Sequence, residues 1–139
     1  MKFLVAWSVL FWINVGFSQQ IEGYWETYDD KTGEKRSVVE IFKKNEQYFG
    51  KIVEKFKGAP NAVCEACEGD KKGQKILGMV IIEDLEKDED EYNGGTITDP
   101  ESGNVYKCYL ELVATNKLKV RGYIGFSLLG RTQYWLRKK

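Results

Sequence analysis

The chain of 139 residues contains no histidine. This absence excludes a Ser-His-Asp triad, a Cys-His nucleophile pair, acid–base catalysis by histidine and any histidine-ligated metal site. An enzyme built on this chain would have to use carboxylates such as Glu40, Glu54 or Asp99 together with tyrosine or arginine. No spacing in the sequence singles out a pair of carboxylates. We therefore predict no catalytic residues and no enzymatic activity, and we keep carboxylate-based catalysis as the less favoured alternative.

The chain also lacks a net charge, because 21 lysines and arginines balance 21 aspartates and glutamates. No long-range electrostatic field therefore favours nucleic acid or an anionic membrane. Only two prolines are present beside 14 glycines, so the turns rely on residues that accept a positive φ. The length leaves room for one domain with one core. We predict no nucleic-acid partner, no cofactor and no metal site, and the sequence indicates no oligomeric state.

The only long apolar run lies at the N-terminus. A lysine precedes the apolar stretch Phe3–Ile13, and the small residues Gly16 and Ser18 follow it. This pattern is typical of a secretory signal peptide, and the stretch is shorter than the ~20 residues that span a bilayer as a helix. We predict a signal peptide over residues 1–18 and a protein exported to the periplasm or secreted, with no membrane span. An uncleaved membrane anchor is the alternative.

The remaining residues, 19–139, are predicted to form a single β-barrel domain. Short segments of alternating apolar residues are separated by turn residues, and no helical periodicity is long enough to matter. Evenly spaced hairpins favour an all-β fold, a small antiparallel up-and-down barrel of about eight strands whose closure removes exposed edges. An open meander or a two-sheet sandwich is the alternative. The eight strands are expected at Glu22–Tyr28, Arg36–Lys43, Gln47–Lys55, Ile76–Asp84, Tyr92–Asp99, Val105–Val113, Lys117–Ile124 and Arg131–Arg137.

Gly23 and Trp25 at the first expected strand resemble the Gly-x-Trp signature of lipocalins and the wider calycins. In those proteins the tryptophan plugs one end of the barrel beneath an arginine from the last strand. A guanidinium stacked on an indole gains about 0.5–2 kcal/mol. Arg131 and Arg137 share one face of the last expected strand with Trp135, so both are available. We predict a structural lock of Gly23, Trp25 and Trp135, with Arg131 as its arginine.

Three cysteines are present. In an exported protein thiols tend to be oxidised, and the two residues between Cys64 and Cys67 allow a tight loop disulfide, which we predict. Two alternatives stay open: pairing of either cysteine with Cys108, and a redox or metal function. A redox motif lacks its strand-to-helix context here, and zinc would need two further soft ligands. Alternation along its strand predicts Cys108 as a buried free thiol.

The last hairpin, Lys117–Arg137, carries more polar and glycine residues than a core-filling hairpin needs. Alternation places Leu118, Val120, Gly122 and Ile124 inward and leaves Arg121 and Tyr123 on the opposite side. Asp99, at the end of an earlier strand, is expected to form an Asx-turn or to meet Arg121 or Arg131. Arginines suit a carboxylate or phosphate head group. The candidate ligand-binding residues are Arg121, Tyr123, Arg131, Gln133, Tyr134 and Asp99.

Four motifs together resemble domain of unknown function family 2147, a family of small exported bacterial proteins. They are GYW at 23–25, CEAC at 64–67, GGTITDP…G…YKC at 94–108 and VRGYIG…GRTQYW at 120–135, and they cover nearly the whole chain after residue 18. The family carries no established activity. The resemblance therefore implies a lipocalin-like barrel and export, and it implies no function.

The function that these observations favour is the binding of a small amphipathic or anionic ligand, because small barrels can hold one ligand inside apolar walls with a few polar anchors. The alternative is a module of the cell envelope that docks a protein or a glycan through exposed tyrosine, tryptophan and arginine.

Overall fold

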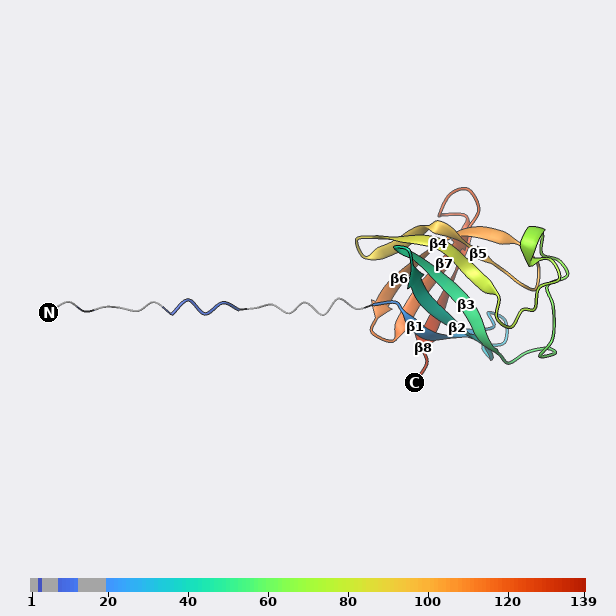
Figure 1. Cartoon of the computed structure of the whole chain (residues 1–139), viewed down its shortest axis with the longest axis horizontal. Coiled ribbons are helices and arrows are strands. Elements are labelled where there is room, and N and C mark those ends of the chain that lie inside the picture. Colours follow the sequence, from blue (N-terminus) through green and yellow to red (C-terminus); the bar gives the residue numbers. More distant parts are fainter. Residues whose placement is uncertain (1–2, 4–7, 13–19) are drawn as a thin grey trace.

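The structure, a computed structural model, describes residue 3, residues 8–12 and residues 20–139 (Figure 1). Most of the signal peptide expected over residues 1–18 lies outside the described residues, so it stays a prediction. Within the described ranges, no helix has the length and apolar character needed to cross a membrane.

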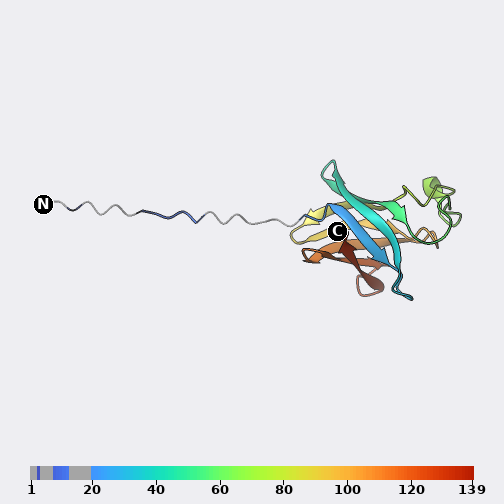
Figure 2. The same cartoon turned by 90° about the horizontal axis from the view of Figure 1, so that it is seen from below.

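The chain folds into a closed antiparallel barrel, in which each strand pairs with the next and β8 pairs with β1 (Figures 1 and 2). The predicted all-β up-and-down barrel is therefore confirmed, and the open meander and the sandwich are excluded. One short 3₁₀ helix, η1 (Gly69–Lys71), lies in the long loop before β4. The strands are β1 (Gly23–Tyr28), β2 (Lys35–Lys44), β3 (Gln47–Lys55), β4 (Val80–Asp88), β5 (Glu91–Thr98), β6 (Val105–Ala114), β7 (Lys117–Tyr123) and β8 (Gly130–Arg137).

β4 is the strand whose position differs most from the sequence prediction, which placed it at Ile76–Asp84. The apolar residues before Val80 belong to the loop, where Gly78 has a φ of 92°. The strand instead continues beyond Asp84 to Asp88, since the side chains of Glu86, Lys87 and Asp88 face water and their backbone pairs with β5. Pairing of the backbone, rather than side-chain hydrophobicity, decides where this strand ends.

One end of the barrel is closed by Trp25, which is fully buried and donates its indole Nε1–H to the carbonyl of Ile21 at 2.8 Å. The guanidinium of Arg137 stacks over the indole at 4.3 Å from the ring centroid. Arg137 also donates to the carbonyl oxygens of Gln20 and Glu22 at 2.9 and 3.1 Å and to that of Thr115 at 3.0 Å. One side chain therefore joins the chain before β1, the β6–β7 turn and β8.

Arg137, and not Arg131, is the arginine of the lock, so that prediction was wrong. Both lie on the inward face of β8, but Arg137 is the register partner of Trp25 whereas Arg131 lies at the other end of the strand. Gly23 has a φ of 135°, and a Cβ there would lie 3.0 Å from the Arg137 Nη1 atom. The glycine of the Gly-x-Trp motif therefore leaves room for the guanidinium.

Cys64 and Cys67 form a disulfide with a Cα–Cα distance of 5.4 Å, as predicted, and Cys108 is a free thiol inside the barrel. The crossed pairing with Cys108 is excluded. Burial raises the pKa of the Cys108 thiol to about 12, so it stays protonated at neutral pH. The disulfide loop packs against the β5–β6 turn, because a Cβ at Gly103 would lie 2.1 Å from the carbonyl oxygen of Ala66.

Replacing Arg137 by methionine is expected to lower the free energy of unfolding by about 2–4 kcal/mol, since the stacking on Trp25 and the hydrogen bonds to three carbonyls are lost together. Urea unfolding followed by near-UV circular dichroism measures the change. Arg131→Met, on the same face at the other end of β8, is the matched control and should cost less than about 1 kcal/mol. Equal losses in the two variants would contradict the assignment of the lock.

Candidate binding site

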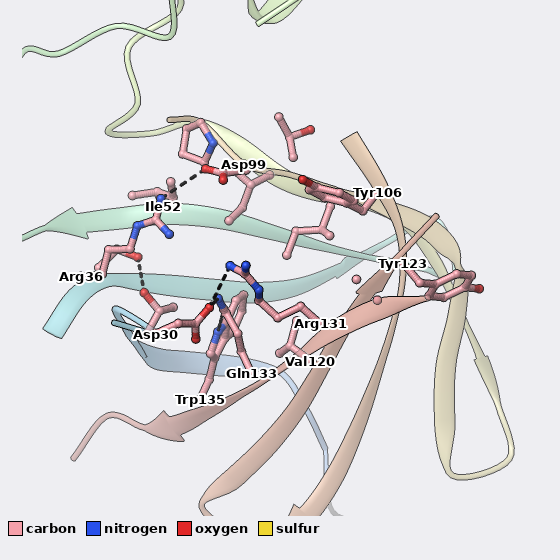
Figure 3. A pocket seen from close by; sticks show the side chains of 18 of the residues that line it. Asp30, Arg36, Ile52, Asp99, Tyr106, Val120, Tyr123, Arg131, Gln133 and Trp135 are labelled. Carbon is pink, nitrogen blue, oxygen red and sulfur yellow. Dashed lines mark hydrogen bonds and ion pairs between the residues drawn. The ribbon is translucent and has the colours of Figure 1, made fainter. Parts of the chain in front are cut away.

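A cavity of about 420 Å³ opens at the end of the barrel opposite the Trp25 plug (Figure 3). Its walls are apolar and its mouth is polar. The apolar walls come from five strands: Ile52, Ile81, Ile97, Val120 and Trp135. The mouth lies where the β1–β2, β5–β6 and β7–β8 connections are. It carries the charged and amide side chains of Asp30, Arg36, Asp99, Arg131 and Gln133.

Gly122 lies on the inward face of β7, as predicted, and borders the cavity. Its φ lies outside the left-handed region, and a Cβ there would lie 3.5 Å from Ile97 and from Tyr106, an ordinary van der Waals distance. The backbone therefore accepts a side chain at this position. The absence of one leaves space in the cavity.

A chain of hydrogen bonds connects the cavity wall to one side of the mouth (Figure 3). The Trp135 indole Nε1–H donates to Oε1 of Gln133 at 3.1 Å, and Nε2 of Gln133 donates to Oδ2 of Asp30 at 3.0 Å. Nη1 of Arg131 lies 3.3 Å from the same Asp30 oxygen. Arg131 and Gln133 thus come together at the mouth, as their shared strand face predicted, and Asp30 holds them.

Asp30 is positioned by the turn between β1 and β2. The preceding Asp29 accepts backbone N–H groups from Lys31 and Thr32 at 2.8 and 3.1 Å, and its other oxygen lies 3.0 Å from Nζ of Lys57. These contacts, the Lys31 N–H first, lower the pKa of Asp29 to about 2. The turn is therefore held as an Asx-turn at neutral pH, which fixes the neighbouring Asp30.

The other side of the mouth is an ion-pair cluster. Nη2 of Arg36 lies 3.3 Å from both Oδ1 of Asp99 and Oε1 of Glu101. Asp99 also accepts the backbone N–H of Glu101 at 2.9 Å, which is the expected Asx-turn. Its cationic partner is Arg36, whereas the sequence suggested Arg121 or Arg131. That suggestion was wrong: Arg121 donates to Thr132 and to the Ser127 carbonyl, and Arg131 pairs with Asp30.

Sequence reasoning missed Arg36 and Asp30 as mouth residues. Arg36 is the first residue of the second expected strand, and Asp30 lies in the turn before it. In an up-and-down barrel the first and fifth strands end at the same side, so the hairpin pattern alone places both residues near Asp99. The alternation of β2 obscured Arg36, since a bulge at Val38 and Val39 shifts the pairing with β3 and buries both valines.

The deeper polar groups near the cavity satisfy one another. The hydroxyls of Thr27 and Ser37 share a hydrogen bond of 2.7 Å, and both residues are buried. Across the described part of the chain, no buried side-chain nitrogen or oxygen lacks a hydrogen-bond partner. Around the cavity, the donors available to a ligand are therefore those of the partly exposed guanidinium groups at the mouth.

Of the three other predicted ligand residues, Tyr123 is among those that line the cavity, whereas Arg121 and Tyr134 are not. The ring of Tyr123 points away from the Arg131–Gln133 cluster (Figure 3) and packs against Tyr109 with 6.4 Å between centroids. Arg121 donates from Nη1 to Thr132 Oγ1 at 2.7 Å and from Nε to the Ser127 carbonyl at 2.6 Å.

Tyr134 lies on the outer face. It is about half exposed, and Nζ of Lys117 lies 4.7 Å from the centre of its ring. The structure therefore brings Tyr123 to the same cavity as Arg131 and Gln133, with its ring turned away, and leaves Arg121 and Tyr134 outside the cavity (Figure 3). In the described ranges, no group of three or more cysteine and carboxylate side chains is arranged to hold a metal ion.

The comparisons with known proteins agree on the fold. The barrel is similar to HP1028, a protein from the human pathogen Helicobacter pylori that is described as belonging to the lipocalin family, with a TM-score of 0.76 and 19% sequence identity. The match covers 86% of this chain and 84% of that one. At this identity the similarity establishes a lipocalin-like fold alone. No curated protein matches the chain.

The family model described as an uncharacterized protein conserved in bacteria, DUF2147, matches residues 23–137, from the glycine of the Gly-x-Trp motif to the arginine that stacks on its tryptophan. The match spans all eight strands of the barrel. The chain therefore belongs to the DUF2147 family of bacterial proteins.

Proposed function

We propose that the protein binds a small amphipathic molecule with an anionic head group in the cavity opposite the Trp25 plug. The observation that carries the proposal is the division of this cavity into apolar walls and a mouth with two arginines, Arg36 and Arg131. An alkyl chain would lie against the walls, and its head group would meet the guanidinium groups at the mouth.

The size of the cavity restricts the ligand. About 420 Å³ lies near the lower end of the range that is usual for small-molecule sites. A medium-length alkyl chain fits this volume better than a long one. The plug of Trp25 and Arg137 closes the far end, so we infer that the ligand enters and leaves through the mouth.

Arg131 is the better of the two arginines for the head group. Its side chain is 76% exposed and has one ion-pair contact, at 3.3 Å to Asp30, although a guanidinium offers five N–H donors. Arg36 already lies between two carboxylates. A carboxylate or phosphate would bind Arg131 beside Asp30 or displace that aspartate, and Gln133 would supply a further amide donor.

We further propose that the protein acts outside the cytoplasm, in the periplasm or after secretion. The apolar run at Phe3–Ile13, typical of a signal peptide, supports this proposal. The Cys64–Cys67 disulfide supports it as well, because structural disulfides persist in oxidising compartments. A ligand taken from that compartment would be a free amphiphile or one released from a membrane.

Decanoate and decyl phosphate are expected to raise the thermal unfolding midpoint, and to bind about tenfold or more tightly than 1-decanol, because only the anions gain charge-assisted hydrogen bonds. Isothermal titration calorimetry gives the affinities. Arg131→Gln should remove the preference for the anions and leave decanol binding in place, whereas Lys119→Gln on the outer face should change neither. If no amphiphile stabilises the protein, the proposal fails; if Arg131→Gln keeps the preference, the head-group assignment fails.

Gly122→Phe is expected to abolish decanoate binding at concentrations that saturate the unaltered protein, because the new ring occupies the cavity. Gly122→Ala, whose Cβ makes ordinary contacts, should still bind. Calorimetry measures binding, and near-UV circular dichroism shows that each variant keeps its packed core. Binding by Gly122→Phe with unchanged affinity would place the ligand elsewhere on the molecule.

The outer face of β6 to β8 favours a second candidate function, the docking of an anionic glycan. Tyr109 and Tyr134 are covered by Nζ of Lys119 and Lys117 at 5.3 and 4.7 Å from the ring centres. Tyrosine rings suit sugar faces, and lysines suit anionic substituents.

If this face is a glycan site, a column of immobilised anionic polysaccharide should retain the protein until a salt gradient elutes it. The double variant Tyr109→Ser and Tyr134→Ser should elute at about the same salt concentration as an unrelated neutral protein. Elution of the unaltered protein with the void volume at low salt would rule the candidate out. Gly122→Phe serves as the control, because a filled cavity does not alter the outer face.

A further inference from the structure

We infer that the β7–β8 loop, Ile124–Leu129, is a membrane-docking element that places the cavity mouth against a lipid bilayer. Figures 1 and 2 show this loop projecting from the barrel. The inference goes beyond ligand binding, because docking through the loop does not require an occupied cavity.

The loop exposes four large apolar side chains within six residues. Ile124 is 67% exposed, Phe126 75%, Leu128 89% and Leu129 66%. Isolated apolar residues are common on protein surfaces, but a contiguous group marks a site of interaction. Two members of this group, Ile124 and Leu129, also line the cavity of the candidate site.

The loop is held in shape by hydrogen bonds rather than by a core of its own. The backbone N–H of Ile124 donates to the carbonyl of Leu129 at 3.1 Å, and that of Leu129 donates to the carbonyl of Phe126 at 2.9 Å. Arg121 supports the loop from β7 by donating to the Ser127 carbonyl. The apolar side chains of Phe126 and Leu128 are therefore presented outward from a pinned turn. Arg121, which the sequence suggested as a ligand residue, therefore positions the loop.

The loop also continues into the cavity. Ile124 and Leu129 line the cavity mouth, while Phe126 and Leu128 lie farther out along the same loop. An amphiphile that leaves the cavity along this side passes from one apolar surface to the next. If the loop tip lies in the acyl region of a bilayer, the alkyl chain avoids water on the way.

The area of the loop favours a bilayer over a protein as its partner. A stable protein interface buries about 800 Å² on each side, which a hairpin tip with four apolar side chains does not provide. A bilayer needs only that a few apolar side chains enter the boundary between head groups and acyl chains. The occupant that suits a small, protruding apolar tip is therefore a membrane surface.

The charges beside the loop indicate a modest preference for anionic lipids. Arg131 follows it on β8, and Lys107 is the register partner of Tyr123, the residue before it. The mouth carboxylate Asp30 is paired with Arg131. Because the whole chain carries no net charge, we expect apolar insertion to dominate and the cations to add a few-fold effect at low salt.

Vesicle co-sedimentation tests the inference, with vesicles of phosphatidylcholine alone and with 30% phosphatidylglycerol as the probes. The chain from Gln20 onward is used beside the full chain, because all eight strands and the plug lie within residues 20–139 and the apolar N-terminal run can bind vesicles itself. The protein starting at Gln20 should sediment with both vesicles, a few-fold more with the anionic ones.

The double variant Phe126→Ser and Leu128→Ser should lower the partition coefficient roughly tenfold or more, because two apolar side chains no longer enter the bilayer. Val113→Ser with Leu136→Ser is the matched control. Both residues are exposed near the plug end, and their replacement should leave vesicle binding unchanged. Gly122→Phe should also bind vesicles normally, which separates docking from ligand binding.

Three results would overturn the inference. The first is no sedimentation with either vesicle, and the second is an equal loss in the loop variant and the control. The third is a concentration-dependent dimer in analytical ultracentrifugation that the loop variant abolishes, because the loop would then be an interface between two copies of the chain.

Discussion

The rest of the structure depends on the stacking of Arg137 over Trp25. The seam between β1 and β8 holds only two register pairs, Trp25 with Arg137 and Glu26 with Leu136, whereas the β7–β8 ladder holds seven. A seam this short offers few backbone hydrogen bonds, so the side-chain contacts of Arg137 carry much of the closure. The same guanidinium binds three carbonyl oxygens that the barrel end would otherwise leave exposed. Losing it would weaken the one seam that keeps β1 and β8 from being free edges.

β8 shows how one strand face serves both ends of the barrel. Arg131, Gln133, Trp135 and Arg137 alternate along the inward side, and each has a different surrounding because the barrel changes from open mouth to closed plug along its axis. Arg137 meets an indole and backbone carbonyls in the plug. Trp135, in the middle, lines the cavity and donates its indole N–H to Gln133. Arg131 lies in the mouth beside a carboxylate. Stability and recognition are thus divided along a single strand.

The sequence predicted the strands well and the pairing of side chains less well, for physical reasons. Alternation and turn residues report local geometry, so the barrel and the inward position of Gly122 followed from them, and the Cys64–Cys67 disulfide followed from the close spacing of its cysteines. The choice between Arg131 and Arg137 depended on where along the barrel axis Trp25 lies, which the register of the β1–β8 seam decides and no local pattern reports. Asp99 was assigned the wrong partner because its contact with Arg36 joins strands that are not neighbours, which no local pattern reports. The register shift of β4 against β3 near Asp84, where φ is 60°, lets both Ile82 and Leu85 face the core. It depends on Gly95 of the other neighbouring strand, because a Cβ there would lie 2.0 Å from the Glu83 carbonyl oxygen.

The lock joins the first and the last strand of the barrel, which has a consequence for how the barrel forms. Trp25 lies in β1 and Arg137 in β8, so the ribosome must release all eight strands before the barrel can close. Until then the growing chain can form hairpins, since consecutive strands are neighbours, but it cannot form the closed barrel. Closure of the barrel is therefore a late step of folding, which follows the local hairpins because it joins residues far apart in the sequence.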